Sequence, residues 1–312
     1  MPAAPAARKA NWDRLRLLSF VDIAAFHMSG QYLLLGTGLP VFLLLRFTLA
    51  SRLSPPESTA TFVRTRVRSL LLPWAAWSLV FGTLGLLVGF RHGRSLGEMF
   101  RPAMLLYGPT EHLWFLPFAA IGGIGVHLLD VATQRVPTRR LAVACGLAGG
   151  ALAWMAQPGA DPLGPPFRQW VFGLPALPLG LGLGRLLARP GPDARRAWAA
   201  VGLVAAMAVA WLGLSRLPGA PLTTAPMRYA LALVLISGGV LLPDLPGRWI
   251  RRITPLLLGG YLLLEPLYSQ TLARVERAAG VELAPWMLVG LMVPFTLAAV
   301  AALRRTPLRA IL

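Results

Sequence analysis

The stretch RTRVRSLLLPWAAWSLVFGTLGLLVGFR, residues 64–91, decides the fold class. Between Arg68 and Arg91 it holds 22 consecutive residues without a charged side chain. A helix needs about 20 predominantly apolar residues to cross a bilayer, or about 17 at the short end. The stretch therefore predicts a transmembrane helix over residues 69–89 that begins directly after a cluster of arginines.

Nine further apolar stretches of similar length follow the same pattern along the chain. They cover residues 15–33, 36–51, 112–130, 140–157, 168–188, 197–215, 228–243, 253–273 and 285–303. The connections between them are short, so no soluble domain is inserted. We therefore predict an all-α integral membrane protein, a bundle of about ten transmembrane helices that forms a single polytopic domain over residues 1–312.

The composition agrees with a membrane protein. Hydrophobic residues make up 56% of the 312 residues and charged residues only 13%, an excess that a soluble protein of this size does not need for its core. Basic residues outnumber acidic ones by 30 to 12, which raises the question of nucleic-acid binding. The arginines stand in short clusters between apolar runs, which is typical of cytoplasmic loops, and we expect no nucleic-acid partner.

The distribution of basic residues predicts the orientation in the membrane. If successive loops alternate sides, the side of the N-terminus carries 21 basic residues. The other side carries eight: Arg91, Arg94, Arg101, Arg168, Arg216, Arg228, Arg274 and Arg277. The positive-inside rule places the richer side in the cytoplasm. We therefore expect a multi-pass protein of the inner (cytoplasmic) membrane with both termini in the cytoplasm, and a first span that is retained rather than cleaved as a signal peptide.

Metal and disulfide chemistry have little support in the sequence. Cys145 is the only cysteine, so no intramolecular disulfide can form. No two of the four histidines have the spacing of zinc ligands. We expect no metal and no tightly bound cofactor.

His27 is the most informative ionisable residue, because such groups are costly inside a bilayer and usually functional. It lies eleven residues after Arg16 on one predicted helix. Eleven residues are about three turns, so both side chains project from nearly the same face, about 16 Å apart. The pattern suits a ligand with an anionic head at the cytoplasmic surface and a reactive tail in the membrane. The alternative is that His27 bonds a neighbouring helix while Arg16 reaches lipid phosphate.

Glu265 lies in the ninth predicted span, thirteen residues after Arg252. The first and ninth spans run in the same direction, so Glu265 and His27 should lie at similar depth. A carboxylate beside the imidazole could orient it and stabilise its charged form. The alternative is a structural ion pair with a residue such as Arg46.

Two polar clusters flank the third and fourth spans. Arg66 and Arg68, with Arg64 before them, offer planar donors for the phosphates of a nucleotide-like ligand, or serve only as positive-inside residues. Glu111, His112 and Trp114 begin the fourth span, and we predict that they contact the substrate; the alternative is an interfacial aromatic anchor with polar neighbours. Four other ionisable residues favour structural roles: Asp22, His127, Asp130 and Asp244.

Several ordered motifs resemble the membrane-bound acyltransferase family 3, which includes O-antigen and other cell-surface glycan O-acetylases. They are Asp13-Arg14-Leu15-Arg16 followed by His27, Gly38–Phe42, Arg66–Trp74, His112–Leu116 and Tyr261–Leu267. Each motif alone is unspecific, but together they span most of the chain in the family's order. In place of the family's late histidine this chain has Glu265, and Arg46-Phe47 stand where the family often has Ser-Gly.

The resemblance implies an acyltransferase with acyl-CoA, such as acetyl-CoA, as cytoplasmic co-substrate. The acceptor is a hydroxyl of a cell-surface glycan or a lipid-linked sugar. His27 is then the catalytic base, and Arg16, Arg66 and Arg68 bind the donor. The depth argument, rather than the resemblance, adds Glu265 as the second catalytic residue beside His27. Two alternatives stay open: a proton-coupled transporter or flippase that uses Asp22, His27 and Glu265, and a non-catalytic member of the family.

Overall fold

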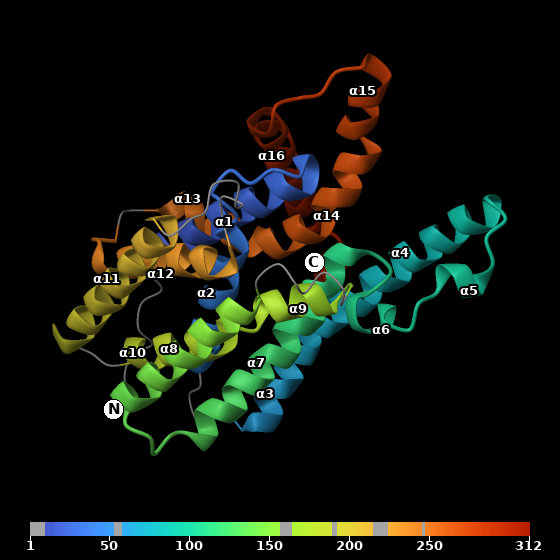
Figure 1. Ribbon diagram of the computed structural model, residues 1–312. Coiled ribbons are helices and arrows are strands. Elements are labelled where there is room, and N and C mark those ends of the chain that lie inside the picture. The colour runs from blue at the N-terminus through green and yellow to red at the C-terminus, as the bar shows by residue number, and fades with distance from the viewer. Residues whose placement is uncertain (1–9, 53–57, 157–163, 189–191, 215–223, 245–246) are drawn as a thin grey trace. The chain divides into compact units, whose positions relative to one another are not determined.

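The computed structural model describes residues 10–52, 58–156, 164–188, 192–214, 224–244 and 247–312 (Figure 1). Within these ranges the chain forms helices, turns and loops and no β-strand. The prediction of an all-α membrane protein is confirmed. Some positions used in the sequence predictions lie outside the described residues: Arg8, Lys9, Arg189, Arg216 and the span ends at residues 157 and 215.

Each of the ten predicted spans overlaps a helical segment of the described chain. In chain order these segments are α1 (Ala10–Ser29), α2 (Gly38–Arg52), α3 (Thr59–Arg66) with η1 (Val67–Leu71) and α4 (Leu72–Arg91), η2 (Glu111–Trp114) with α7 (Phe115–Ala132), α8 (Thr138–Met155), α9 (Phe167–Gly173) with α10 (Ala176–Leu187), α11 (Pro192–Leu214), α12 (Ala225–Leu241), α13 (Arg248–Ile253) with η4 (Thr254–Leu256) and α14 (Leu257–Gln270), and α16 (Pro285–Leu303). Shorter helices lie between or after them: α5 (Leu96–Met99), α6 (Met104–Tyr107), α15 (Leu272–Ala279) and η5 (Pro307–Ile311).

Five helical segments of the described chain are long and apolar enough to cross a membrane by length and composition. They are Thr59–Arg91, Glu111–Ala132, Phe167–Leu187, Asp193–Gly213 and Pro285–Leu303. Two shorter apolar helices cover Gly38–Ser51 and Ala225–Leu241. That α1, α2, α8, α12 and α14 also cross the membrane stays a prediction from the sequence.

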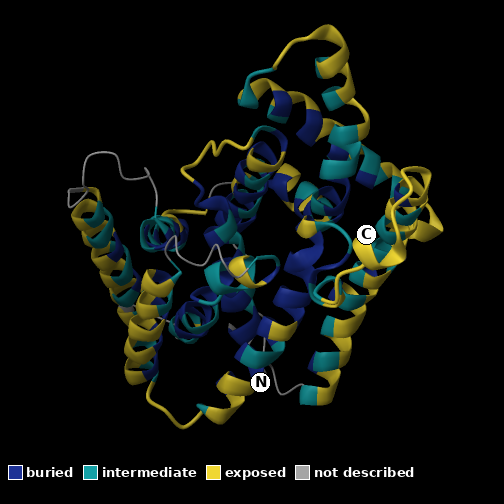
Figure 2. Cartoon of the chain, turned by 45° about the vertical axis from the view of Figure 1, so that its right-hand side comes forward, coloured by how far each residue is buried: buried dark blue, intermediate teal, exposed yellow. Residues whose placement is uncertain are grey.

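Large apolar side chains lie exposed along whole helices. Met155 is 74% exposed, Leu79 72% and Trp211 71%. Figure 2 shows such exposed residues as yellow stretches that run along helices as well as in loops. Extended apolar surfaces of this kind are rare on soluble monomers and are typical of helices that face lipid.

The chain packs as two compact units, and α2 passes from one to the other. The first unit comprises Met1–Leu45 and Arg189–Leu303, and the second comprises Arg46–Ala188 and Arg304–Leu312. One family domain can contain two packing units. That residues 1–312 form a single polytopic domain therefore stays a prediction.

The core of the first unit lies where α1, α14 and α16 meet. Phe20, Ala24 and Met28 recur every four residues on α1 and pack against Leu257 and Leu264 of α14. From α16, the residues Leu288, Met292 and Val293 complete the cluster. Within a membrane, close packing rather than the hydrophobic effect holds helices together, and small residues permit it. Gly260 is such a residue, because a Cβ there would lie 3.0 Å from the Phe20 ring.

Two aspartates hold the ends of α1 in place. Near its start, the Asp244 carboxylate accepts the backbone N–H groups of Ala10 (3.0 Å) and Asn11 (2.9 Å), which caps the helix from 234 residues away. Near its end, Asp22 accepts the N–H groups of Leu34 (2.6 Å) and Gly38 (2.9 Å). Both carboxylates therefore act as structural hydrogen-bond acceptors.

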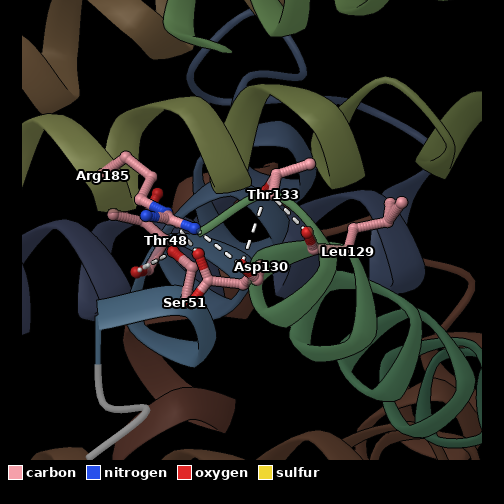
Figure 3. A network of polar contacts seen from close by, with 6 residues as sticks. All are labelled: Thr48, Ser51, Leu129, Asp130, Thr133 and Arg185. Atoms are coloured by element: carbon pink, nitrogen blue, oxygen red, sulfur yellow. Dashed lines mark hydrogen bonds and ion pairs between the residues drawn. The ribbon is translucent and has the colours of Figure 1, made fainter. Parts of the chain in front are cut away.

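An ion pair joins α7 and α10 in the second unit (Figure 3). Arg185 donates from Nε to Asp130 Oδ1 at 2.5 Å and from Nη2 to the Asp130 carbonyl oxygen at 2.6 Å. Nearby, Ser51 of α2 occupies the space that a side chain at Gly184 would need. The side chains of Arg185 and Asp130 are only 18% and 10% exposed, so each charge depends on the other for compensation.

Asp130→Asn should destabilise the protein, because it leaves the guanidinium of Arg185 largely buried without its carboxylate. We expect a loss on the order of 3 kcal/mol, measured as a lower unfolding temperature in detergent. Asp193→Asn is the matched control, since the pair Asp193–Arg196 spans 3.7 Å and its side chains are 88% and 83% exposed. Equal unfolding temperatures for the two variants would contradict the structural role of the buried pair.

Candidate active site

His27 lies in the last turn of α1 and is exposed. It continues the face of α1 that packs on α14, because Phe20, Ala24 and His27 are spaced by four and three residues. Its imidazole meets the ring of Tyr261 edge to face, with centroids 6.3 Å apart and an interplanar angle of 81°. A second edge contact, at 5.9 Å, joins it to Phe26. Two aromatic rings therefore define where the imidazole stands.

Glu265 follows Tyr261 by four residues on α14 and is half-buried. Residues four apart lie on the same face of a helix, so the carboxylate belongs to the α14 face that carries Tyr261. The contact with Tyr261 thus brings His27 to the helix that bears Glu265. A direct contact between the imidazole and the carboxylate stays a prediction.

Tyr261 is the residue that the sequence argument missed. It begins the motif Tyr261–Leu267, but the candidate site residues within the spans were chosen for their charge, and tyrosine is normally uncharged. The signal that could have found it is its spacing of four residues before Glu265. An aromatic ring at that position contacts any side chain that approaches the carboxylate along the helix.

Arg16 lies in the first half of α1 and is held by a buried acid. Its Nη1 donates to Asp13 Oδ1 at 3.2 Å, and the Asp13 side chain is fully buried. The guanidinium is thereby oriented eleven residues, or about 16 Å, before His27 on nearly the same face. The predicted spacing between a cationic group and an imidazole on one helix is present.

Arg66 and Arg68 lie where the long helical segment Thr59–Arg91 changes its winding. At η1 the helix takes one π turn, in which the Leu72 N–H bonds to the Val67 carbonyl five residues back. Pro73 explains this turn, because it lacks an N–H and its ring would collide with a carbonyl in a regular α-helix. The predicted span over residues 69–89 did not include this turn.

The two arginines differ in their surroundings. Arg66 is half-buried, and its Cζ lies 4.5 Å from the centroid of the Phe62 ring. Phe62 in turn stacks on His127, with centroids 4.2 Å apart, and His127 Nε2 lies 3.3 Å from Thr59 Oγ1. Arg68 is exposed. One guanidinium is therefore fixed on an aromatic stack while the other extends into the surroundings, which suits the binding of an extended anionic ligand.

The predicted substrate contacts of the fourth span fall into two groups. Glu111 is exposed at the start of η2. His112 and Trp114 are 4% and 6% exposed. The ring of His112 meets Phe81 at 5.4 Å, and that of Trp114 meets Phe118 at 5.5 Å. Glu111 is therefore exposed while His112 and Trp114 are buried, and that all three contact the substrate stays a prediction.

The fold defines the class of protein, an all-helical membrane protein with several apolar helices long enough to span a bilayer. The sequence profile of the acyltransferase domain of acyltransferase family 3 matches residues 9–305. The chain belongs to this family, as the motifs from Asp13 to Leu267 predict, and it is a membrane acyltransferase. No curated protein and no solved structure matches the chain.

Tyr261→Leu should lower the rate of acyl transfer, because it removes the ring that positions the imidazole of His27. Aromatic contacts are worth about 0.5–1.5 kcal/mol, so we expect a loss of roughly threefold to tenfold. Turnover in proteoliposomes measures it. Tyr261→Phe keeps the ring and should stay near the wild-type rate. If Phe costs as much as Leu, the hydroxyl rather than the ring supports His27.

Proposed function

We propose that this acyltransferase moves a small acyl group, such as acetyl, from cytoplasmic acyl-CoA to a hydroxyl of a cell-surface glycan or a lipid-linked sugar. The observation that carries the proposal is the placement of His27 at the contact between α1 and α14. There an exposed imidazole stands against Tyr261, one helical turn from Glu265. An accessible base held by rings and near a carboxylate is the arrangement that general-base catalysis needs.

In the proposed reaction His27 removes the proton of the acceptor hydroxyl. The oxygen attacks the thioester carbonyl, a C–O bond forms, and the C–S bond breaks. The leaving sulfur takes the proton back from the imidazolium, which restores the neutral base and releases CoA. Glu265 orients the imidazole and stabilises its charged form during the transfer.

From the sequence, the residues proposed to contact the donor are Arg16, Arg66 and Arg68. Guanidinium groups offer planar donors that match phosphate oxygens, and CoA carries several phosphates. By the arginine distribution all three residues lie on the cytoplasmic side, where acyl-CoA is available. We place the protein in the inner membrane, with both termini in the cytoplasm.

The rival reading as a transporter needs Asp22 as a member of a proton relay. Asp22 is 1% exposed, and its two carboxylate oxygens accept the backbone N–H groups of Leu34 and Gly38. A carboxylate with both oxygens engaged in this way stabilises the loop after α1 and the start of α2, which is a structural role. The position of Asp22 therefore favours the transferase.

Replacement of both Arg66 and Arg68 by Ala should weaken acyl-CoA binding while the protein still folds and inserts. Each charge-assisted hydrogen bond contributes about 1.5–3 kcal/mol, so we expect the dissociation constant to rise at least roughly tenfold. Replacement of Arg139 and Arg140 by Ala removes the same charge from another arginine cluster of the same predicted side and should leave the affinity near that of the wild type. Equal losses in both double variants would return Arg66 and Arg68 to a purely topological role.

His27→Gln should abolish acyl transfer but spare donor binding, because glutamine keeps polarity and cannot take up the proton. General-base assistance accounts for about 10²–10⁴-fold in rate. Transfer by reconstituted protein and acyl-CoA affinity, measured on the same preparation, separate the two effects.

Glu265→Gln is the companion variant. It should reduce transfer less than His27→Gln does, because the carboxylate assists the imidazole and does not itself take up the proton of the acceptor. An active His27→Gln protein together with an inactive Glu265→Gln protein would exchange the two roles and refute the mechanism.

A further inference from the structure

A stack of side chains leads from His27 to a guanidinium at the start of α12. The ring of Phe26 stacks on Tyr32 with centroids 4.4 Å apart and an interplanar angle of 5°. On Tyr32 lies Arg228, whose Cζ is 4.6 Å from the ring centroid and whose Nη1 donates to Tyr32 Oη at 3.3 Å. Phe26 in turn meets His27. Two aromatic rings thus separate the guanidinium from the imidazole.

The loop that supplies Tyr32 is fixed in an unusual conformation. Gly30, Leu35 and Gly36 have φ angles of 70°, 56° and 73°. A positive φ is strained for leucine, and such residues concentrate at ligand sites, where the surrounding structure holds them. Here the buried Asp22 holds the loop through the N–H groups of Leu34 and Gly38.

Gly36 lets the loop backbone approach the guanidinium of Arg228 closely, because glycine has no side chain. A Cβ at Gly36 would lie 2.8 Å from Cζ and 2.9 Å from Nε of the arginine, so any side chain there would displace the guanidinium. The loop backbone and the ring of Tyr32 together define its position. Phe26 and Tyr32 are nonetheless 38% and 36% exposed, so the stack lies at an accessible surface.

Arg228 lies on the predicted outer side of the membrane, where the positive-inside rule does not explain a basic residue. It is one of the eight basic residues on the predicted outer side. A guanidinium carries five N–H donors in its plane, and its face rests on Tyr32. A planar donor fixed in this way suits a carboxylate or a phosphate.

From this arrangement we infer that Arg228, held by Tyr32 and Gly36, forms an anion-binding subsite for the acceptor, two aromatic rings away from His27. The inference rests on the proposed function, because His27 must be the base that meets the acceptor hydroxyl. The acceptor is then a glycan that bears an acidic group, either a sugar carboxylate or the diphosphate that links a sugar to its lipid carrier. Arg228 binds that group while the hydroxyl faces the imidazole.

Binding of three matched ligands to the full-length protein in nanodiscs tests the inference. Decyl glucoside is neutral, decyl glucuronide carries a carboxylate, and glucosyl decyl diphosphate carries the anionic linkage. The wild-type protein should bind at least one anionic ligand about tenfold more tightly than decyl glucoside, and high salt should reduce that preference. Which of the two binds identifies the source of the acidic group. A wild-type protein without preference for either overturns the inference.

Arg228→Gln should remove the preference and leave the affinity for decyl glucoside unchanged. Arg228→Lys keeps the charge without the planar donors and should retain part of the preference for anionic ligands. A partial preference in this variant would also show that substitution at this position does not misfold the protein. Arg274→Gln is the matched control, because Arg274 is exposed on the same predicted side and bonds Gln270. A preference that survives in Arg228→Gln, or that is lost equally in Arg274→Gln, contradicts the subsite.

His27→Gln separates this inference from the proposed function. The variant should bind the anionic ligands as the wild-type protein does, since it lacks only the base. If His27→Gln transfers acyl groups normally, the proposed mechanism fails while the binding data still decide on Arg228. If His27→Gln is inactive and Arg228→Gln binds normally, the mechanism stands and the subsite fails.

Discussion

The packing of α1 against α14 is the interaction on which the rest of the account depends. Phe20 and Ala24 meet α14 at Gly260 and Leu264, and the same face of α1 ends in His27. Inside a bilayer such a contact is held by close packing rather than by exclusion of water, so its register is set by the shapes of a few side chains. Asp244 accepts backbone N–H groups at the start of α1, and Asp22 of α1 accepts those of Leu34 and Gly38 in the segment that follows the helix. The position of the imidazole is therefore determined by packing along the helix and by hydrogen bonds near both of its ends.

In the proposed function, one helix would contact both ends of a long donor. Arg16, paired with the buried Asp13, stands about 16 Å before His27 on nearly the same face. A donor with phosphates at one end and a thioester at the other matches this order, because its phosphates suit Arg16 and its thioester suits His27. The acceptor must reach the imidazole from elsewhere, and the loop that presents Tyr32 and Arg228 lies directly after α1. The donor would then reach the imidazole of His27 from the side of Arg16, and the acceptor would reach it from the side of Arg228.

Much of the fold followed from the sequence, because lipid imposes a simple rule on length and polarity. The ten apolar stretches overlap ten helical segments, and the ordered motifs predicted the family that residues 9–305 match. Contacts between residues far apart in the sequence could not be predicted from it. Asp244 caps a helix 234 residues away, and Arg228 lies on a ring 196 residues before it. Nothing local in the sequence marks such pairs. The π turn at Val67–Leu71 was missed for a different reason, since Pro73 permits a kink, a break or a wide turn alike.

The central claim is that the imidazole of His27 is the base of the transfer, and chemical rescue tests it most directly. His27→Ala opens space at an exposed position in the last turn of α1, where free imidazole can enter. The measurement is acyl transfer by the reconstituted variant as a function of imidazole concentration, with acyl-CoA binding checked on the same preparation. The account predicts that imidazole restores transfer in a saturable manner and does not stimulate the wild-type protein. A variant that binds acyl-CoA normally and stays inactive at every imidazole concentration would contradict it.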